Sequence, residues 1–254
     1  FKKKFNYKYS ASVSSCTSGL ELVLKTLKLK KNDEVILSSF NFIAAGIAIK
    51  KNQAKPIFID QKKNSFEIDF EDLKKKINSK TKAILLTHFN GYLQNSIGIR
   101  NLIKKTKHKI FFLEDCAHVL AAEHKKNIYS GSYSDAAVFS FGPTKMITSG
   151  GMGGMVISKH KELIKQINIL KSFGMDKSAY NRKSDKKNWE YNIQSIGANY
   201  RMTEIQAAFG LEQLKKVNYF KSKKNQISRF YQKNLNNKEL FFQSSNFTYS
   251  CALI

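Results

Sequence analysis

Cysteine, proline and arginine are scarce in this sequence, and each shortage narrows the class of protein. The three cysteines, Cys16, Cys116 and Cys251, have no CxxC spacing, which argues against a disulfide framework and is typical of a reducing compartment. No apolar run approaches the roughly 20 residues that a membrane-spanning helix needs, and no secretion signal opens the chain. We therefore expect a cytoplasmic protein that does not bind membranes.

The shortage of arginine matters because the chain is strongly basic. Lysine and arginine number 44 against 19 acidic residues, a formal net charge of +25. Such a charge often indicates a nucleic-acid partner, yet only four of these residues are arginine, the side chain that reads bases and phosphates best. Lysine is spread along the chain, and Asn, Ile, Phe and Tyr are also abundant, which is typical of AT-rich coding DNA. We expect no nucleic-acid partner, although a protein that binds anions through its charge remains an alternative.

Short apolar segments alternate with amphipathic ones, and 42% of the residues are hydrophobic, enough for a sizeable core. The apolar segments predict buried strands at residues 34–39, 56–60, 83–89, 110–115, 136–141 and 154–158. Apolar stripes between them predict helices at residues 18–30, 70–77, 97–106 and 203–217. This alternation indicates an α/β fold of three layers, with helices on both faces of a mainly parallel sheet.

One large domain should occupy residues 1–235. A long helix is expected after Val217, and residues 236–239 break it, so residues 236–254 should begin a smaller C-terminal α+β domain. The chain opens on Phe1 and stops at Ile254 within a strand-like segment, and we interpret it as part of a longer protein. The polar residues 176–192 predict a long loop.

Asp115 closes a predicted buried strand, where an unpaired carboxylate is costly. Glu114 beside it should face the opposite side of the sheet, since side chains alternate along a strand. Asp115 could cap the turn that follows, or it could pair with a cationic atom of a cofactor. This residue alone leaves both interpretations open.

Two other segments carry candidate chemistry. Residues 14–22, SSCTSGLEL, place hydroxyl groups before a helix, where free N–H groups can bind an anion, although this segment taken alone favours a plain helix cap. Lys145 lies in SFGPTKMITSGGMGG, among small residues and glycines. A lysine in a crowded, partly apolar pocket becomes a nucleophile toward carbonyl groups. No GKS, GKT or GxGxxG pattern supports a nucleotide-binding loop.

An anion-binding helix start, a carboxylate at a strand end and a reactive lysine together match the needs of pyridoxal 5'-phosphate (PLP). The helix would bind its phosphate, the carboxylate its protonated pyridine nitrogen, and the lysine its aldehyde. We expect PLP as the cofactor and no metal.

With these residues in place, the chain resembles the DegT/DnrJ/EryC1/StrS family of PLP-dependent sugar aminotransferases, which have the aspartate-aminotransferase fold (fold type I). The resemblance runs from about residue 10 to residue 217. It rests on motifs in a fixed order: SSCTSGLEL, DEVILSSFNFIAAGIAI, PIFIDQ, KAILLTHFNG, FFLEDCAHVLAA, GSYSDAAVFSFGPTKMITSGGMGGMV and GANYRMTEIQAAFGLEQL. One motif would be weak, but the ordered series is specific.

The resemblance implies three catalytic residues. Lys145 would hold the cofactor aldehyde and then shuttle a proton between substrate and cofactor. Asp115 would pair with the pyridine nitrogen. His118 would lie near the ring oxygen of the cofactor.

The resemblance also implies further cofactor-binding residues. Phe42 would stack on the ring, and Thr17, Ser18 and Ser140 would bind the phosphate. Asn199 would reach the phosphate of a neighbouring subunit, which would make the protein an obligate homodimer.

The implied reaction moves an amino group from glutamate to a nucleotide-diphosphate keto-sugar, in the synthesis of amino sugars for cell-surface polysaccharides or glycans. Three residues depart from the family pattern: Met152 stands where glutamate is common, Cys16 where glycine is common, and Ala198 where tyrosine is frequent. Relatives with histidine at the lysine position act as dehydratases, and Lys145 argues against that activity. A catalytically weak member with a regulatory or binding role is the alternative.

Overall fold

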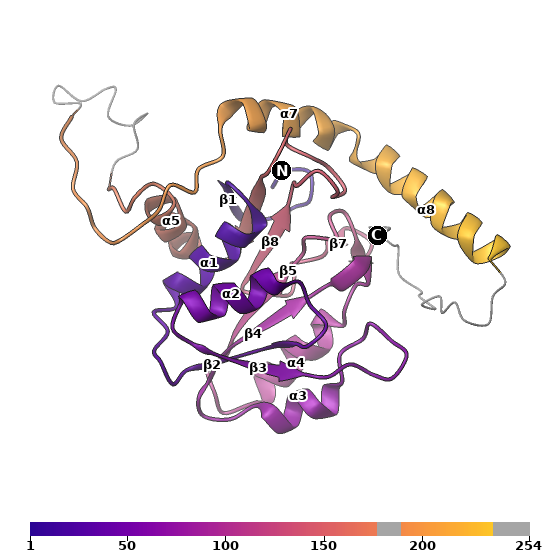
Figure 1. The fold of residues 1–254 in the computed structure, drawn as a ribbon, viewed down its shortest axis with the longest axis horizontal. Coiled ribbons are helices and arrows are strands. Elements are labelled where there is room, and N and C mark those ends of the chain that lie inside the picture. The colour runs from indigo at the N-terminus through magenta and orange to yellow at the C-terminus, as the bar shows by residue number, and fades with distance from the viewer. Residues whose placement is uncertain (177–188, 236–254) are drawn as a thin grey trace.

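Within residues 1–176 and 189–235, which the computed structural model describes, a seven-stranded sheet forms the centre of the protein (Figure 1). Its strands lie in the order β1-β9-β8-β5-β4-β2-β3. In chain order they are β1 (Tyr9–Val13), β2 (Glu34–Ser38), β3 (Lys55–Ile59), β4 (Thr81–Thr87), β5 (Phe111–Asp115), β8 (Ala136–Ser140) and β9 (Gly154–Ser158). A separate hairpin consists of β6 (Glu123–Lys125) and β7 (Ile128–Tyr129).

The sheet is mainly parallel, as predicted. Neighbouring strands from β8 through β5, β4 and β2 to β3 all pair in parallel, whereas β9 is antiparallel to both β8 and β1. Parallel strands bring their carboxyl ends to one edge of a sheet, where ligands bind in α/β proteins. The last residues of β4, β5 and β8, which are Thr87, Asp115 and Ser140, therefore lie at one edge.

Helices cover both faces of this sheet and complete the predicted three layers (Figure 1). On one face, α1 (Cys16–Thr26), α2 (Ile43–Lys51) and α5 (Lys161–Leu170) share a core with alternate strand residues. On the other face, α3 (Phe70–Lys76) and α4 (Ser96–Lys105) pack against the intervening strand residues. The short 3-10 helix η1 (Phe89–Gly91) follows β4, and α7 (Glu204–Lys215) and α8 (Val217–Asn234) run end to end along one side.

Most predicted elements are confirmed within two residues of their expected ends, including all the predicted strands. The helix predicted at residues 18–30 begins at Cys16 and ends at Thr26, because Lys28 takes a positive φ of 51° that no helix continues. Strand β1 was not predicted, because its YSASV sequence is short and largely small and polar. Helices α2 and α5 were not predicted either.

Two close approaches hold the start of α1 against the sheet. A Cβ atom added at Gly19 would lie 2.6 Å from Cγ1 of Val138 in β8. One added at Gly154 would lie 2.8 Å from backbone atoms of both Phe139 and Ser15. Only glycine fits such contacts without displacing the backbone, so the first turn of α1 is fixed directly beside the ends of β8 and β9.

The expected small domain at residues 236–254 and most of the loop predicted at residues 176–192 lie outside the described residues. The long helix expected after Val217 is present as α8. In the part of the chain that the structure describes, no helix combines the length and the apolar character needed to span a membrane.

Candidate active site

A cavity of about 460 Å³ opens at the carboxyl edge of the sheet, beside the first turn of α1. Of the eight side chains predicted for the site, six line this cavity: Thr17, Phe42, Asp115, His118, Ser140 and Lys145. They come from five separate stretches of the chain, and the parallel sheet brings them together. Ser18 and Asn199 do not line it.

Asp115 is a buried carboxylate at the end of β5. Its Oδ1 accepts hydrogen bonds from the backbone N–H of Ala117 at 3.0 Å and from the thiol of Cys16 at 3.6 Å. Burial raises the pKa of Asp115 above its ordinary value, although these two hydrogen bonds oppose that effect. Within the described residues no cation forms an ion pair with it. The carboxylate therefore both caps a turn and remains available to a cationic ligand.

Lys145 and His118 form the second part of the site. Nζ of Lys145 lies 2.7 Å from Nε2 of His118, and Nδ1 of His118 accepts a hydrogen bond from the backbone N–H of Asn90 at 3.0 Å. Burial lowers the pKa of His118 to about 4, with smaller contributions from Lys145 and Lys224, so the ring is neutral near pH 7. Since Nδ1 is an acceptor, the ring proton resides on Nε2, from which it can be donated to the lysine nitrogen when that amine is uncharged.

The start of α1 supplies polar groups to the same cavity. Thr17 lines it together with Ser15, and the N–H groups of Cys16 and Thr17 stand at helix positions that have no partner within a helix. Ser18 has a different task. Its hydroxyl and that of Ser15 form a capping box, with Ser15 Oγ accepting from Ser18 N at 3.0 Å. The structure thus confirms the helix cap, and anion binding by the neighbouring groups that face the cavity stays a prediction.

Three further predicted residues differ in their surroundings. Ser140 ends β8, is buried, and accepts a hydrogen bond from Gly142 N at 3.3 Å. Phe42 precedes α2 and is 64% exposed, so its ring lies at the rim of the cavity. Asn199 is exposed and its Oδ1 accepts a hydrogen bond from Arg201, away from the cavity of its own chain.

Comparison with known proteins identifies the fold and the family. The model of the DegT/DnrJ/EryC1/StrS aminotransferase family matches residues 1–248. The chain belongs to this family.

Individual relatives agree with this assignment. GDP-perosamine synthase of Escherichia coli O157:H7 is 36% identical over 236 residues, which cover 93% of this chain and 61% of that protein. Helicobacter pylori PseC, an aminotransferase in pseudoaminic acid biosynthesis, is 30% identical with a TM-score of 0.86, over 97% of this chain and 65% of its own. Spr1654 from Streptococcus pneumoniae, solved in a PMP form, has a TM-score of 0.89 at 25% identity and covers 99% of this chain and 68% of its own.

The chain thus spans about three fifths of the length of the curated relatives that it matches. Its fold is the PLP-dependent transferase fold type I, and PLP is the cofactor of this family. The cavity suits PLP on its own evidence, because it is lined by a lysine amine, by the first residues of α1 and by a buried carboxylate that pairs with no cation among the described residues.

Several residues of the site escaped the sequence analysis. Phe89 lines the cavity, and its ring centroid lies 5.6 Å from that of His118. Asn90 takes a positive φ of 51°, which directs its N–H to His118. Asparagine tolerates this conformation better than most residues, and the Asn90-Gly91 pair after a strand was a usable signal of a tight turn.

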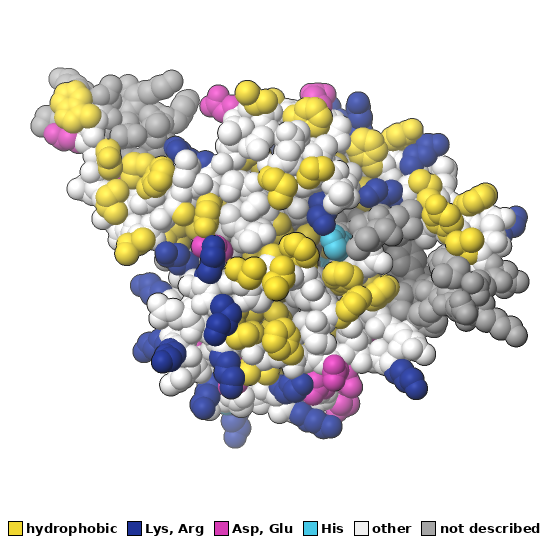
Figure 2. All heavy atoms as spheres, viewed as in Figure 1, with side chains coloured by type: hydrophobic (Ala, Val, Ile, Leu, Met, Phe, Trp, Pro, Cys, Tyr) yellow, Lys and Arg dark blue, Asp and Glu magenta, His cyan; other side chains and the backbone are white. Residues whose placement is uncertain are grey.

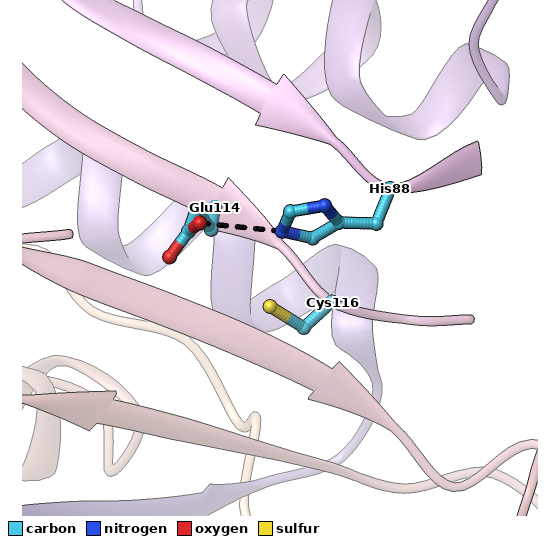
Figure 3. A group of neighbouring side chains, drawn as sticks. All are labelled: His88, Glu114 and Cys116. Atoms are coloured by element: carbon cyan, nitrogen blue, oxygen red, sulfur yellow. Dashed lines mark hydrogen bonds and ion pairs between the residues drawn. The ribbon is translucent and has the colours of Figure 1, made fainter. Parts of the chain in front are cut away.

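A second group of polar side chains lies behind Asp115, on the opposite face of the sheet, as alternation along β5 predicts for Glu114. Figure 3 shows the ring of His88 directed at Glu114, with the thiol of Cys116 beside them. Nε2 of His88 lies 3.3 Å from Oε1 of Glu114, and Ser96 donates to the same oxygen. Burial alone would raise the pKa of Glu114, but the hydrogen bonds from His88 and Ser96 outweigh it and hold that pKa below its ordinary value.

This buried group resembles a set of metal ligands but is held as a hydrogen-bonded network. Nδ1 of His88 accepts from Gln94 N at 3.0 Å, so the ring proton is on Nε2, which donates to Glu114. That nitrogen offers no lone pair to an ion. Burial also keeps the pKa of Cys116 well above its ordinary value, so its sulfur remains a thiol.

The lowered pKa of His118 predicts a pH-dependent contribution to stability. Between pH 6.5 and about 4, the unfolded chain takes up a proton at His118 that the folded chain does not. The free energy of unfolding of the cofactor-free protein should therefore fall more steeply with acidification than that of His118→Gln. The difference between the two slopes should approach the value for one proton taken up on unfolding. Urea unfolding at a series of pH values measures this. His108→Gln, which removes an exposed histidine, is the matched control, and parallel curves for wild type and His118→Gln would contradict the assignment.

Proposed function

We propose that this protein is a PLP-dependent aminotransferase that moves an amino group from glutamate to a nucleotide-linked keto-sugar. The observation that carries the proposal is the convergence of Lys145, His118 and Asp115 on one cavity beside the start of α1. Family membership and the sugar aminotransferases among its relatives support the same reaction. Their names also support a role in the synthesis of amino sugars for polysaccharides or other glycans.

The residues of the cavity have complementary tasks in this function. The N–H groups at the start of α1, with the hydroxyls of Thr17 and Ser140, would hold the phosphate. Asp115 would pair with the ring nitrogen, and this cation would compensate the charge that β5 buries. Phe42 would cover one face of the ring. The cofactor, when bound, supplies the electron sink that lets a bond to the substrate carbon break.

Lys145 and His118 would together control the transfer of the α-proton of the amino donor. Lys145 Nζ would bind the cofactor in the resting enzyme and, once displaced by a substrate amine, would take the α-proton of the amino donor. His118, fixed through Asn90, directs its Nε2–H at this amine and restrains where it can move. A neutral imidazole does this without adding a positive charge beside the lysine.

A second cavity, of about 270 Å³, supports an anionic acceptor. It adjoins the first at Lys145 and is lined also by Phe220, Lys223 and Lys224 of α8 and by Gln213 of α7. Two consecutive lysines of α8 that line this cavity, beside the reactive amine, would suit the diphosphate of a nucleotide sugar. We therefore expect acceptor binding to weaken as the salt concentration rises.

The cofactor assignment predicts a yellow protein whose cofactor is attached to one lysine. Borohydride reduction followed by peptide mapping should place the label on Lys145, and adding glutamate before reduction should prevent the labelling while releasing 2-oxoglutarate. Lys145→Arg should remove the label. Lys171→Arg is the matched control, since it alters another part-buried lysine away from the cavity. Label on Lys145 without a response to glutamate would favour the regulatory or binding alternative, and label spread over many lysines would contradict the function.

We also propose that the active protein is a homodimer. The face that carries α2 and α7 exposes large hydrophobic side chains (Figure 2), among them Ile43, Ile205 and Leu211, at 69%, 84% and 57% exposure. α7 also touches the site, because Nε2 of Gln206 donates to the carbonyl of Met152 at 2.8 Å. A second copy of the chain covering this face would bury the apolar side chains and bring its Asn199 to the phosphate.

Subunit complementation tests the proposed role of Asn199. Lys145→Ala and Asn199→Ala should each be strongly impaired alone. A mixture refolded together should recover roughly a quarter of the wild-type activity, because half of the dimers are mixed and each mixed dimer has one intact site. If Asn199 acts within its own subunit, or the protein is a monomer, the mixture should remain as inactive as its components.

A further inference from the structure

Cys16 occupies an unusual place, between the two parts of the site that bind opposite ends of the cofactor. It is the first residue of α1, it is buried, and it lines the cavity. Its Sγ lies 3.6 Å from Oδ1 of Asp115, a normal length for a hydrogen bond from a thiol. One side chain therefore connects the helix start to the carboxylate at the end of β5.

The thiol has two acceptors within reach and only one proton to donate. The carbonyl oxygen of Val138 lies 3.9 Å from Sγ, farther than Oδ1 of Asp115. A carboxylate is also the stronger acceptor. Burial, and then the charge of Asp115, raise the pKa of Cys16 well above its ordinary value, so the sulfur keeps the proton that it donates.

The two oxygens of Asp115 consequently have different roles. Oδ1 accepts from both Cys16 and the N–H of Ala117, whereas Oδ2 accepts no hydrogen bond from any residue that the structure describes. Two donors on one oxygen restrain the rotation of the carboxylate. The second oxygen is left for a ligand in the cavity.

We propose that Cys16 is a positioning residue for Asp115: its thiol holds Oδ1 so that Oδ2 is presented to the pyridine nitrogen of the cofactor. This inference rests on the proposed function, because it requires PLP in the cavity. Removing the thiol frees the carboxylate to rotate, so that Oδ2 is no longer held toward the ring nitrogen and pairs with it less well. The ring nitrogen then retains its proton less well, and the nitrogen that joins Lys145 to the cofactor becomes more basic.

The test compares PLP binding and the visible spectrum in four full-length proteins: wild type, Cys16→Ala, Cys16→Ser and Cys116→Ala. Cys16→Ala should bind PLP about 3- to 10-fold more weakly, the equivalent of one weak hydrogen bond. The midpoint of its pH-dependent change in the visible band should move to higher pH. Cys16→Ser keeps a donor and should restore most of both properties. The other titratable groups near the carboxylate, His88 and Lys145, are the same in all four proteins.

Cys116→Ala is the matched control. Cys116 is also a buried thiol and follows Asp115 in the chain, but it donates no hydrogen bond to that carboxylate. Its substitution should leave both readouts unchanged. If Cys16→Ala binds PLP normally with an unshifted midpoint, or if Cys16→Ser behaves like Cys16→Ala, the thiol only fills space and the inference is wrong. A wild-type protein that binds no PLP at Lys145 would instead overturn the proposed function, and the role of Cys16 with it.

Discussion

The burial of the Asp115 carboxylate is the constraint on which the rest of the site depends. A charge at the end of a central strand costs folding energy unless it is hydrogen-bonded or paired. Here the chain supplies two donors to one oxygen and, among the described residues, no cation. The fold tolerates this charge, and in the proposed function a cationic ligand would compensate it, which accounts for the convergence of α1, the turn after β5 and the loop with Lys145 on Asp115.

The topology of the sheet places the other residues of the site around Asp115. Because β4, β5 and β8 are parallel neighbours, their ends deliver Thr87, Asp115 and Ser140 to one edge. The glycine contacts of α1 place its N-terminus at that edge with little freedom. Glu114, one residue before Asp115, is satisfied separately on the opposite face by His88 and Ser96 (Figure 3). Adjacent carboxylates on β5 thus have different surroundings, and only Asp115 faces the cavity.

Much of this could be predicted from the sequence, and the failures have physical causes. Strand ends and a lysine among glycines are local sequence patterns, so Asp115, Ser140 and Lys145 could be identified from the sequence. The phosphate role expected for Ser18 stays a prediction; its hydroxyl takes part in the cap of α1, which depends on the backbone angles at Ser15 and could not be foreseen from residue type. The N–H of Asn90 that sets the His118 tautomer is a backbone group, so the Asn90-Gly91 pair could indicate the turn but not the partner of that N–H. The role of Asn199 stays a prediction, because it needs a second chain.

The central claim is that Asp115 keeps the ring nitrogen of the bound cofactor protonated. Nitrogen-15 NMR of the protein loaded with PLP labelled at the pyridine nitrogen measures this protonation directly. The account predicts a protonated ring nitrogen in the wild type near neutral pH and an unprotonated one in Asp115→Ala. An unprotonated nitrogen in the wild type, or the same signal in both proteins, would contradict it.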